Sequence, residues 1–167
     1  MRAPDLIDEL YDASYGRLVV QMLALCGNQT DAEDAVQEAF VQALRHRDRL
    51  GFVDRPEAWL RTVALNHLRN GWRHTKVARR LVVRVPGPRA DLDLGPDHVA
   101  LVAALQQLDS TSREVVVLHH LADLTVDEIA HQLGLAPGTV KSRLSRSRAR
   151  LAELLDDSID REAESRG

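Results

Sequence analysis

The sequence has few of the residues that mark several large classes of proteins. It holds one cysteine, Cys26, and aromatic residues make up 4% of its 167 positions. A single cysteine cannot form a disulfide within the chain, and the scarcity of aromatic side chains favours small helical cores over a large sandwich. Because Cys26 lies in the apolar run VVQMLALC, we expect its thiol to be buried and structural rather than reactive.

Long hydrophobic runs are also missing. No stretch approaches the roughly 18 apolar residues that a membrane-spanning helix needs. The first residues, MRAPDLIDEL, are acidic and lack the apolar core of a secretory signal. We therefore expect no membrane insertion and a cytoplasmic protein.

The chain shows no pattern typical of an enzyme. No cysteine or carboxylate set with metal-ligand spacing accompanies His119, His120 or His131, and His67 and His74 stand seven residues apart. Solvated or core histidines are the simpler interpretation. The sequence also lacks a nucleophile–base grouping and a phosphate-binding glycine loop. We expect no catalytic residue, no metal and no cofactor.

Charges are segregated along the chain, although the net charge is only −3. Residues 51–90 hold nine Lys or Arg against two Asp or Glu, and residues 135–151 hold five against none. The segments around these two basic blocks are acidic. Such segregation predicts two surfaces that contact a polyanion. Chance clustering on solvated helix faces is the alternative.

Apolar residues recur at helical spacing nearly throughout, and no stretch alternates convincingly as a strand. Gly27-Asn28 predicts the end of a first long helix, and Thr30–Glu33 predicts a capping box that starts the second. Another helix is expected to open with Pro56 in its first turn. We expect the second helix to bury Val36, Phe40, Ala43 and Leu44, and the next to bury Leu60, Val63, Ala64 and Leu68.

Residues 81–97 separate two helical regions. Their sequence, LVVRVPGPRADLDLGPD, contains three prolines and two glycines and has no helical period. It is typical of a flexible linker between domains. We therefore predict an all-α chain with two small helical domains, at residues 1–80 and 98–160, and a short acidic tail at 161–167.

The second domain contains the strongest local pattern. Capping boxes are predicted at Thr111–Glu114 and Thr125–Glu128. The second box opens a helix over 126–133, Gly134 makes a sharp turn, and a further helix begins near Pro137. This spacing is that of a helix-turn-helix, whose second helix enters the major groove of DNA.

A helical wheel divides that last helix into two sides. Ser142, Ser145 and Arg146 lie opposite the predicted core side, with Lys141 and Arg143 flanking them. Arginine can bond guanine through two hydrogen bonds, and basic side chains at the rim can meet phosphates. The helix is thus predicted to lie against DNA; the alternative is a solvated basic helix that closes an ordinary bundle. The predicted core side consists of Val140, Leu144, Ser147 and Leu151.

Three segments resemble a known family. DAEDAVQEAFVQALRH and PEAWLRTVALNHLRNGWR are similar to the first domain of extracytoplasmic-function (ECF) sigma factors, group 4 of the sigma-70 family. LDSTSREVVVLHHLADLTVDEIAHQLGLAPGTVKSRLSRSRARL is similar to their second domain. The resemblance covers about residues 10–155 with the motifs in order. It implies a non-enzymatic bacterial subunit that lends promoter recognition to core RNA polymerase.

The resemblance also assigns a polymerase-binding helix. Asp34, Gln37 and Glu38 match the family's helix that docks on the clamp helices of the β′ subunit. An acidic face that meets a basic coiled coil is electrostatically sensible, while ordinary solvated helix surface is the alternative. Phe40 falls in the same helix, where a core position is expected rather than a contact.

A loop and the helix after it match the family's reader of the −10 element. The loop over 50–57 corresponds to one that captures a flipped base, although its sequence LGFVDRPEA departs from the usual Gly/acidic/Ser pattern and Thr62 stands where a basic residue is common. Phe52 either stacks on a base or packs onto the protein, and Trp59 either contacts DNA or belongs to the core. The matching positions are Phe52, Arg55, Trp59, Asn66, Arg69, Asn70 and Arg73.

In the second domain the resemblance assigns recognition of the −35 element. The adjoining surface would meet the flap of the β subunit, and an anti-sigma factor is a candidate partner because many members of the family have one. The acidic linker residues Asp91 and Asp93 either thread toward the RNA exit path or form a disordered tether. The matching −35 positions are Thr139, Lys141, Ser142, Arg143 and Arg146.

One alternative function remains open from the sequence. LTVDEIAHQLGLAPGTVKSRL also resembles the output domains of response regulators, which would make the chain a stand-alone helix-turn-helix regulator. Such a protein needs a dimer interface or a receiver domain, and the N-terminal half shows no phosphoacceptor pattern on alternating strands and helices. Dependence on polymerase would separate the two functions.

Overall fold

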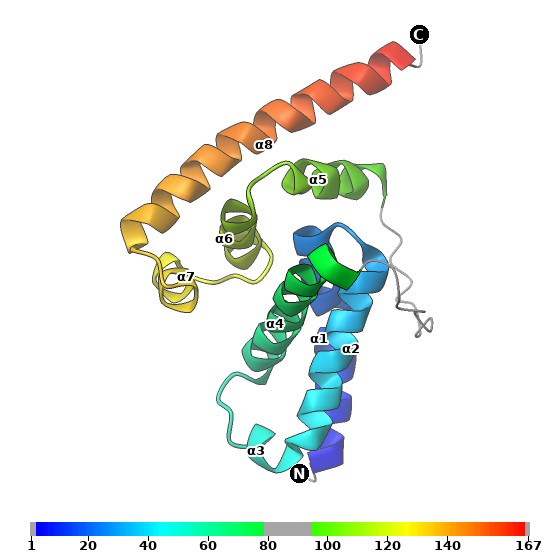
Figure 1. Cartoon of the computed structure of the whole chain (residues 1–167), viewed down its shortest axis with the longest axis vertical. Coiled ribbons are helices and arrows are strands. Elements are labelled where there is room, and N and C mark those ends of the chain that lie inside the picture. Colours follow the sequence, from blue (N-terminus) through cyan, green and yellow to red (C-terminus); the bar gives the residue numbers. More distant parts are fainter. Residues whose placement is uncertain (1–2, 79–94, 166–167) are drawn as a thin grey trace. The chain divides into compact units, whose positions relative to one another are not determined.

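The computed structural model describes residues 3–78 and 95–165, with side chains placed over 6–74 and 95–157. Every regular element in these ranges is a helix, which confirms the all-α prediction (Figure 1). The helices form two compact units, α1–α4 and α5–α8. Most of the predicted linker at 81–97, including Asp91 and Asp93, lies outside the described residues.

The first unit is built on three long helices that pack against one another in pairs. They run at small angles to each other, and the one-turn helix α3 lies where α2 ends (Figure 1). Leu18 of α1, Val36 of α2 and Leu60 of α4 are fully buried between them. The helices are α1 (Ala3–Cys26), α2 (Gln29–Arg45), α3 (Arg47–Leu50) and α4 (Pro56–Ala78).

The second unit packs three short helices along one long one. α5, α6 and α7 each contact α8, and α6 also contacts α7. α8 continues to Ser165, so the helix extends into the segment expected to be an acidic tail. The helices are α5 (Pro96–Gln106), α6 (Ser110–His120), α7 (Val126–Leu133) and α8 (Pro137–Ser165).

Two of the three predicted capping boxes are wrong in position. α2 begins at Gln29, and Asn28 caps it by accepting a hydrogen bond from the Asp31 amide at 3.0 Å. α6 begins at Ser110, capped by Asp109. In both places an Asn or Asp side chain two residues before the expected Thr accepts a hydrogen bond from a free backbone amide. The helix therefore starts earlier, and the Thr becomes part of its first turn.

The capping box of α7 is confirmed. Thr125 Oγ1 accepts a hydrogen bond from the Glu128 amide at 3.2 Å, and the Thr125 amide donates to Glu128 Oε2 at 2.8 Å. Gly134 has a φ of 65°, the left-handed conformation that ends a helix and suits glycine. The helix-turn-helix therefore has the predicted boundaries.

Three burial predictions in the first unit are also wrong. Val63 of α4 is half-buried rather than buried. Leu44 is 55% exposed, because Phe40 and Ala43 complete the buried stripe of α2 and Leu44 lies beyond its edge. Cys26 is half-buried at the end of α1, where its Sγ donates to the Asn28 carbonyl at 3.2 Å. Phe40 is 6% exposed, so its expected place in the core is confirmed.

Candidate polymerase-binding and DNA-binding surfaces

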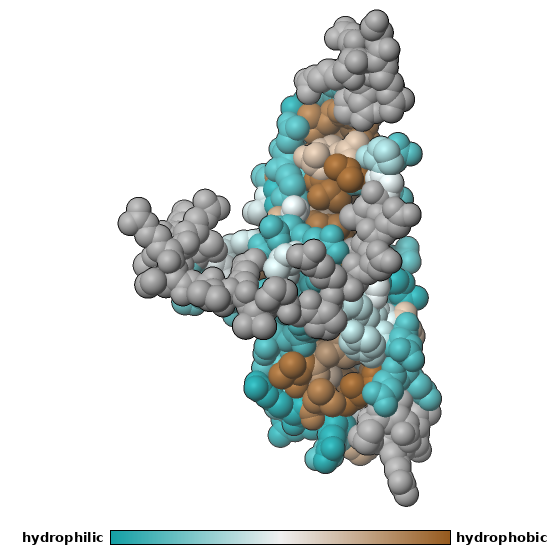
Figure 2. Space-filling view, turned by 90° about the vertical axis from the view of Figure 1, so that its right-hand side faces the viewer, coloured by the Kyte–Doolittle hydropathy of each residue, from teal (hydrophilic) through white to brown (hydrophobic). Residues whose placement is uncertain are grey.

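α2 presents a mixed acidic and apolar strip to solvent. Asp34, Gln37 and Glu38 are half-buried on the side opposite its core residues. Val41 and Leu44 follow at helical spacing and are 39% and 55% exposed. We call these five residues the α2 outer strip. Figure 2 shows a hydrophobic patch, bordered by hydrophilic surface, toward the end of the first unit where α2 ends.

Sequence reasoning found the acidic half of this strip and missed the apolar half. Leu44 was predicted to lie in the core, and the sequence prediction did not include Val41. The missing signal was periodicity, since positions 41 and 44 continue the three- and four-residue steps from position 37. Exposed aliphatic side chains beside carboxylates are typical of a protein interface.

Aromatic side chains from α1 pack against Phe40 of α2. The rings of Tyr11 and Tyr15 stack with their centroids 4.6 Å apart, and Tyr11 meets Phe40 edge-on at 5.1 Å. Burial raises the pKa of the Tyr15 hydroxyl, which lies near Gln37. These contacts join α1 to α2, and Tyr15 brings them close to Gln37 of the strip.

The loop between α3 and α4 exposes its aromatic residue. Phe52 is 89% exposed, so of the two alternatives it does not pack onto the protein in this structure. Arg55 is also exposed, whereas Trp59 in the first turns of α4 is half-buried. An exposed phenyl ring on a short loop offers a flat apolar surface on which a base can stack.

One side of α4 collects the other predicted −10 residues. Positions 59, 66, 69, 70 and 73 fall within about 100° of one another on a helix of 3.6 residues per turn. Asn66, Asn70 and Arg73 are exposed, and Arg69 is half-buried. The structure thus places the −10 candidates from this helix on a single surface, which we call the α4 outer face.

A buried arginine that the sequence did not single out holds α4 in place. Arg61 is 6% exposed, and its Nε donates to Gln21 Oε1 of α1 at 2.9 Å. Its Nη2 lies 3.7 Å from Glu57 Oε1, and Glu57 Oε2 accepts from Arg17 Nη2 at 2.6 Å. This network ties α4 to α1 on the side away from the α4 outer face. The sequence signal for this contact is an arginine at a core position of an amphipathic helix.

The helix-turn-helix presents α8 as predicted. Val140, Leu144 and Ser147 are buried, at 0%, 4% and 3% exposure. Leu151, also predicted to face the core, is half-buried. Opposite them, the exposed side chains of the first three turns form a polar and basic surface, which we call the α8 outer face. Its residues are Lys141, Ser142, Ser145 and Arg146.

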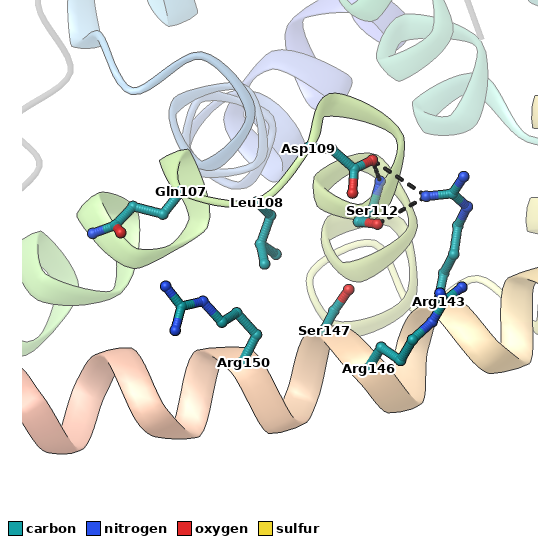
Figure 3. A pocket seen from close by; sticks show the side chains of 8 residues that line it. All are labelled: Gln107, Leu108, Asp109, Ser112, Arg143, Arg146, Ser147 and Arg150. Atoms are coloured by element: carbon teal, nitrogen blue, oxygen red, sulfur yellow. Dashed lines mark hydrogen bonds and ion pairs between the residues drawn. The ribbon is translucent and has the colours of Figure 1, made fainter.

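Two of the predicted −35 residues are less exposed than that face. Thr139 is half-buried. Arg143 is turned toward α6, where its Nη1 donates to Ser112 Oγ at 3.0 Å and lies 3.3 Å from Asp109 Oδ1. Hydrogen bonds from Ser112, with a smaller contribution from Arg143, hold the pKa of Asp109 below its usual value. These contacts hold the Arg143 side chain against the start of α6 (Figure 3).

The described residues contain neither a candidate metal centre nor a membrane-spanning helix. Within these ranges, His, Cys, Asp and Glu side chains nowhere gather in a set of three that could hold a metal ion. None of the described helices combines the length and apolar character that a bilayer crossing requires. The surfaces to be explained are therefore the α2 outer strip, the exposed loop with the α4 outer face, and the α8 outer face.

Comparisons with known proteins match both units. The chain fits the family model for Sigma-70 region 2 over residues 10–80 and that for Sigma-70, region 4 over residues 98–151. It is 35% identical over 144 residues to the RNA polymerase sigma factor CnrH of Cupriavidus metallidurans, covering 77% of this chain and 75% of that protein. It is 35% identical over 147 residues to the ECF RNA polymerase sigma factor SigL of Mycobacterium tuberculosis, covering 83% and 82%.

Solved structures share the fold. One holds the sigma factor RpoE in complex with the anti-sigma factor NepR from Bartonella quintana, with a TM-score of 0.69, 27% identity and coverage of 91% of this chain and 97% of that one. Another holds CnrH with the cytosolic domain of CnrY, with a TM-score of 0.58, 28% identity and coverage of 90% and 88%. With both regions matched in order and full-length relatives above 30% identity, this chain belongs to the ECF sigma factors of the sigma-70 family.

Proposed function

We propose that this chain binds core RNA polymerase and directs it to promoters by contacting their −10 and −35 elements. The observation that carries the proposal is the pairing of two units on one chain, each with an outward polar face on a helix that the family uses for DNA. A stand-alone regulator is not favoured, because the α1–α4 unit matches sigma region 2. The protein acts without catalysing a reaction, in the cytoplasm where polymerase works.

The two units divide the work. Residues 1–80 bind polymerase through the α2 outer strip, whose carboxylates attract the basic β′ clamp helices and whose Val41 and Leu44 supply apolar contact. The exposed loop with Phe52 and the α4 outer face contact the −10 element and help to open it. Residues 98–160 contact the −35 element through the α8 outer face, next to the β flap.

Attachment to polymerase explains how a net-acidic protein can use DNA-binding helices. Free in solution, a chain with a net charge of −3 gains little from non-specific attraction to DNA. Polymerase holds both units near the same duplex, which raises the effective concentration of each for its element. An anti-sigma factor is a candidate partner, since the solved relatives RpoE and CnrH were each captured with another protein.

Run-off transcription with purified bacterial core polymerase on a genomic fragment library tests the proposal. Discrete new start sites should appear when this protein is added and should weaken strongly with Asn66→Ala or Arg146→Ala. Both side chains are exposed, so their removal leaves the fold intact. Absence of new starts, together with polymerase-independent binding to a palindromic site, would instead identify a stand-alone regulator.

A further inference from the structure

Two side-chain hydrogen bonds join the start of α4 to α1. Glu57 Oε2 accepts from Arg17 Nη2 at 2.6 Å, and Arg61 Nε donates to Gln21 Oε1 at 2.9 Å. The two residues on each helix are four positions apart, so the bonds lie about one helical turn from each other on both helices. Two contacts at this spacing fix both the rotation of α4 and its position along α1. We call these four residues the α1–α4 ladder.

Glu57 connects the two bonds of the ladder. Its Oε1 lies 3.7 Å from Arg61 Nη2, so its carboxylate stands between two guanidinium groups. The Arg61 side chain is 8% exposed, and a charge buried this deeply needs a partner of opposite sign. Leu18 and Leu60, next to the ladder in sequence, are fully buried. Because apolar packing is non-directional, the ladder adds the directional contacts that such packing lacks.

A carboxylate at position 57 is unexpected in this part of the sequence. Residues 51–90 hold nine Lys or Arg, and Glu57 is one of two acidic residues among them. A negative charge there opposes binding to DNA, which is itself a polyanion. The contacts of this carboxylate with Arg17 and Arg61 neutralise it and direct it toward α1. They indicate that Glu57 anchors the start of α4.

The ladder lies close in sequence to the loop that exposes Phe52. This loop, residues 51–55, joins α3 to α4 (Figure 1). Its first end is held by the buried Leu50 and by the Phe52 amide, which donates to the Arg49 carbonyl at 3.0 Å. Its other end runs directly into α4, two residues before Glu57. The contacts that fix the first turn of α4 therefore also fix this end of the loop.

The Phe52 ring depends on the backbone of its loop for its position, because it is 89% exposed. A loop that is fixed at both ends loses less conformational entropy when a ligand binds, which favours binding. We propose that Arg17 and Glu57 are positioning residues, which hold the loop so that the Phe52 ring stacks on an unpaired base of the −10 element. This proposal rests on the proposed function.

The experiment uses the full chain with core polymerase and a promoter found by the run-off assay. The template is opened in advance over the −10 element by a non-complementary strand, so that binding is measured without the cost of melting. Further templates carry one abasic site at each −10 position in turn. On the intact template Phe52→Ala should weaken binding by about 5- to 150-fold, the range for stacking one base on an aromatic ring. At one abasic position this loss should disappear, which identifies the stacked base.

Arg17→Ala and Glu57→Gln should show the same dependence on the template. The Arg17 side chain is 62% exposed, so its removal leaves the core intact. Each variant should weaken binding to the intact template by about 3- to 10-fold, since an exposed ion pair is of modest strength. The loss should disappear at the same abasic position as for Phe52→Ala. The double variant should lose no more than Glu57→Gln alone, because both substitutions break the same contact.

Val19→Ala is the control for a general loss of stability. Val19 is fully buried on α1 and is not part of the ladder, and its truncation leaves a cavity in the same unit. Any effect of this variant on binding should be equal on the intact and the abasic templates. Thermal melts measure how far each variant is destabilised.

The outcomes separate the positioning role from the sigma function. If the losses for Arg17→Ala and Glu57→Gln persist at every abasic position, as for Val19→Ala, the ladder is structural and the positioning role is wrong. The positioning role is also wrong if either variant, or Phe52→Ala, binds the intact template as tightly as wild type. If wild-type protein yields no start sites with core polymerase, the proposed function itself fails.

Discussion

Arg143 of α8 and Asp109 at the start of α6 form an ion pair across 34 residues of sequence, with Arg143 Nη1 3.3 Å from Asp109 Oδ1. The same guanidinium donates to the hydroxyl of Ser112, which is 7% exposed. One arginine thus ties α8 to α6. Its neighbours Lys141 and Ser142 remain exposed.

Arg143→Ala should destabilise the second unit without altering which bases are read. The Asp109 carboxylate is 63% exposed, so its pair with Arg143 contributes little, and the loss comes mainly from the bond to buried Ser112. We expect the free energy of unfolding, measured with urea on the full chain, to fall by about 1 kcal/mol. Arg146→Ala is the control and should leave stability nearly unchanged while reducing transcription. A change in base preference at the −35 element with Arg143→Ala would make it a base reader instead.

Asp109 should contribute to stability in a defined pH range. Its pKa is lowered from 3.8, first by the hydrogen bonds from Ser112. A depressed pKa stabilises the folded chain above pH 3.8, and this contribution is lost as the pH falls through the folded value. Asp109→Asn keeps a good helix cap but removes the titration. Urea unfolding from pH 6 to about pH 3 should therefore show a shallower loss of stability for the variant than for wild type; parallel curves would contradict this assignment.

His120 should make the second unit less stable in mild acid. Burial lowers its pKa below the ordinary 6.5, and His119 and Arg148 lower it further. The folded state therefore favours the neutral ring, and stability falls as the pH drops below 6.5. His120→Gln should flatten the decline in thermal midpoint between about pH 7 and pH 5. His131→Gln, an exposed histidine on α7, is the control and should follow the wild-type curve.

Arg61→Ala should loosen α4 on α1. It removes the bond to Gln21 Oε1 and the positive charge beside Glu57, and a buried charged hydrogen bond of this kind is worth about 2 kcal/mol. Thr62→Ala changes the adjacent, exposed residue and should cost under about 0.5 kcal/mol. Urea unfolding measures both. If promoter opening in permanganate footprints also declines with Arg61→Ala alone, Arg61 positions the α4 outer face. If the two variants lower the free energy of unfolding equally, Arg61 does not hold α4 against α1.

Leu44→Asp should weaken binding to core polymerase without affecting the fold. Leu44 is 55% exposed, so its replacement leaves the core intact. We expect an affinity loss of at least about 10-fold if this side chain is buried at the interface. Titration of fluorescently labelled protein with core polymerase measures the loss, and a thermal melt checks the fold. Arg45→Asp, the next residue, is exposed as well and tests for a general effect of negative charge; equal losses would assign the effect to charge.

Several features of this chain follow from local sequence alone. Thr125 and Glu128 bond each other across a single turn, Gly134 is the residue that a left-handed turn favours, and Pro137 suits a first turn. Interactions over three or four residues need no knowledge of the rest of the chain. The helix-turn-helix was therefore predictable to the residue. The order of the two sigma regions was equally readable from their motifs.

Other features depended on how the helices pack. Whether Leu44 is buried, whether Phe52 is exposed and where Arg143 points depend on partners far away in sequence. The caps of α2 and α6 lie two residues before the predicted ones because Asn28 and Asp109 accept hydrogen bonds from the Asp31 and Ser112 amides and start each helix earlier. Residues 107–109, between α5 and α6, meet Ser112 and Ser147 around one pocket only when the helices pack. Local periodicity thus determined which helices form, and their tertiary packing decided which of their polar side chains remain free to bind.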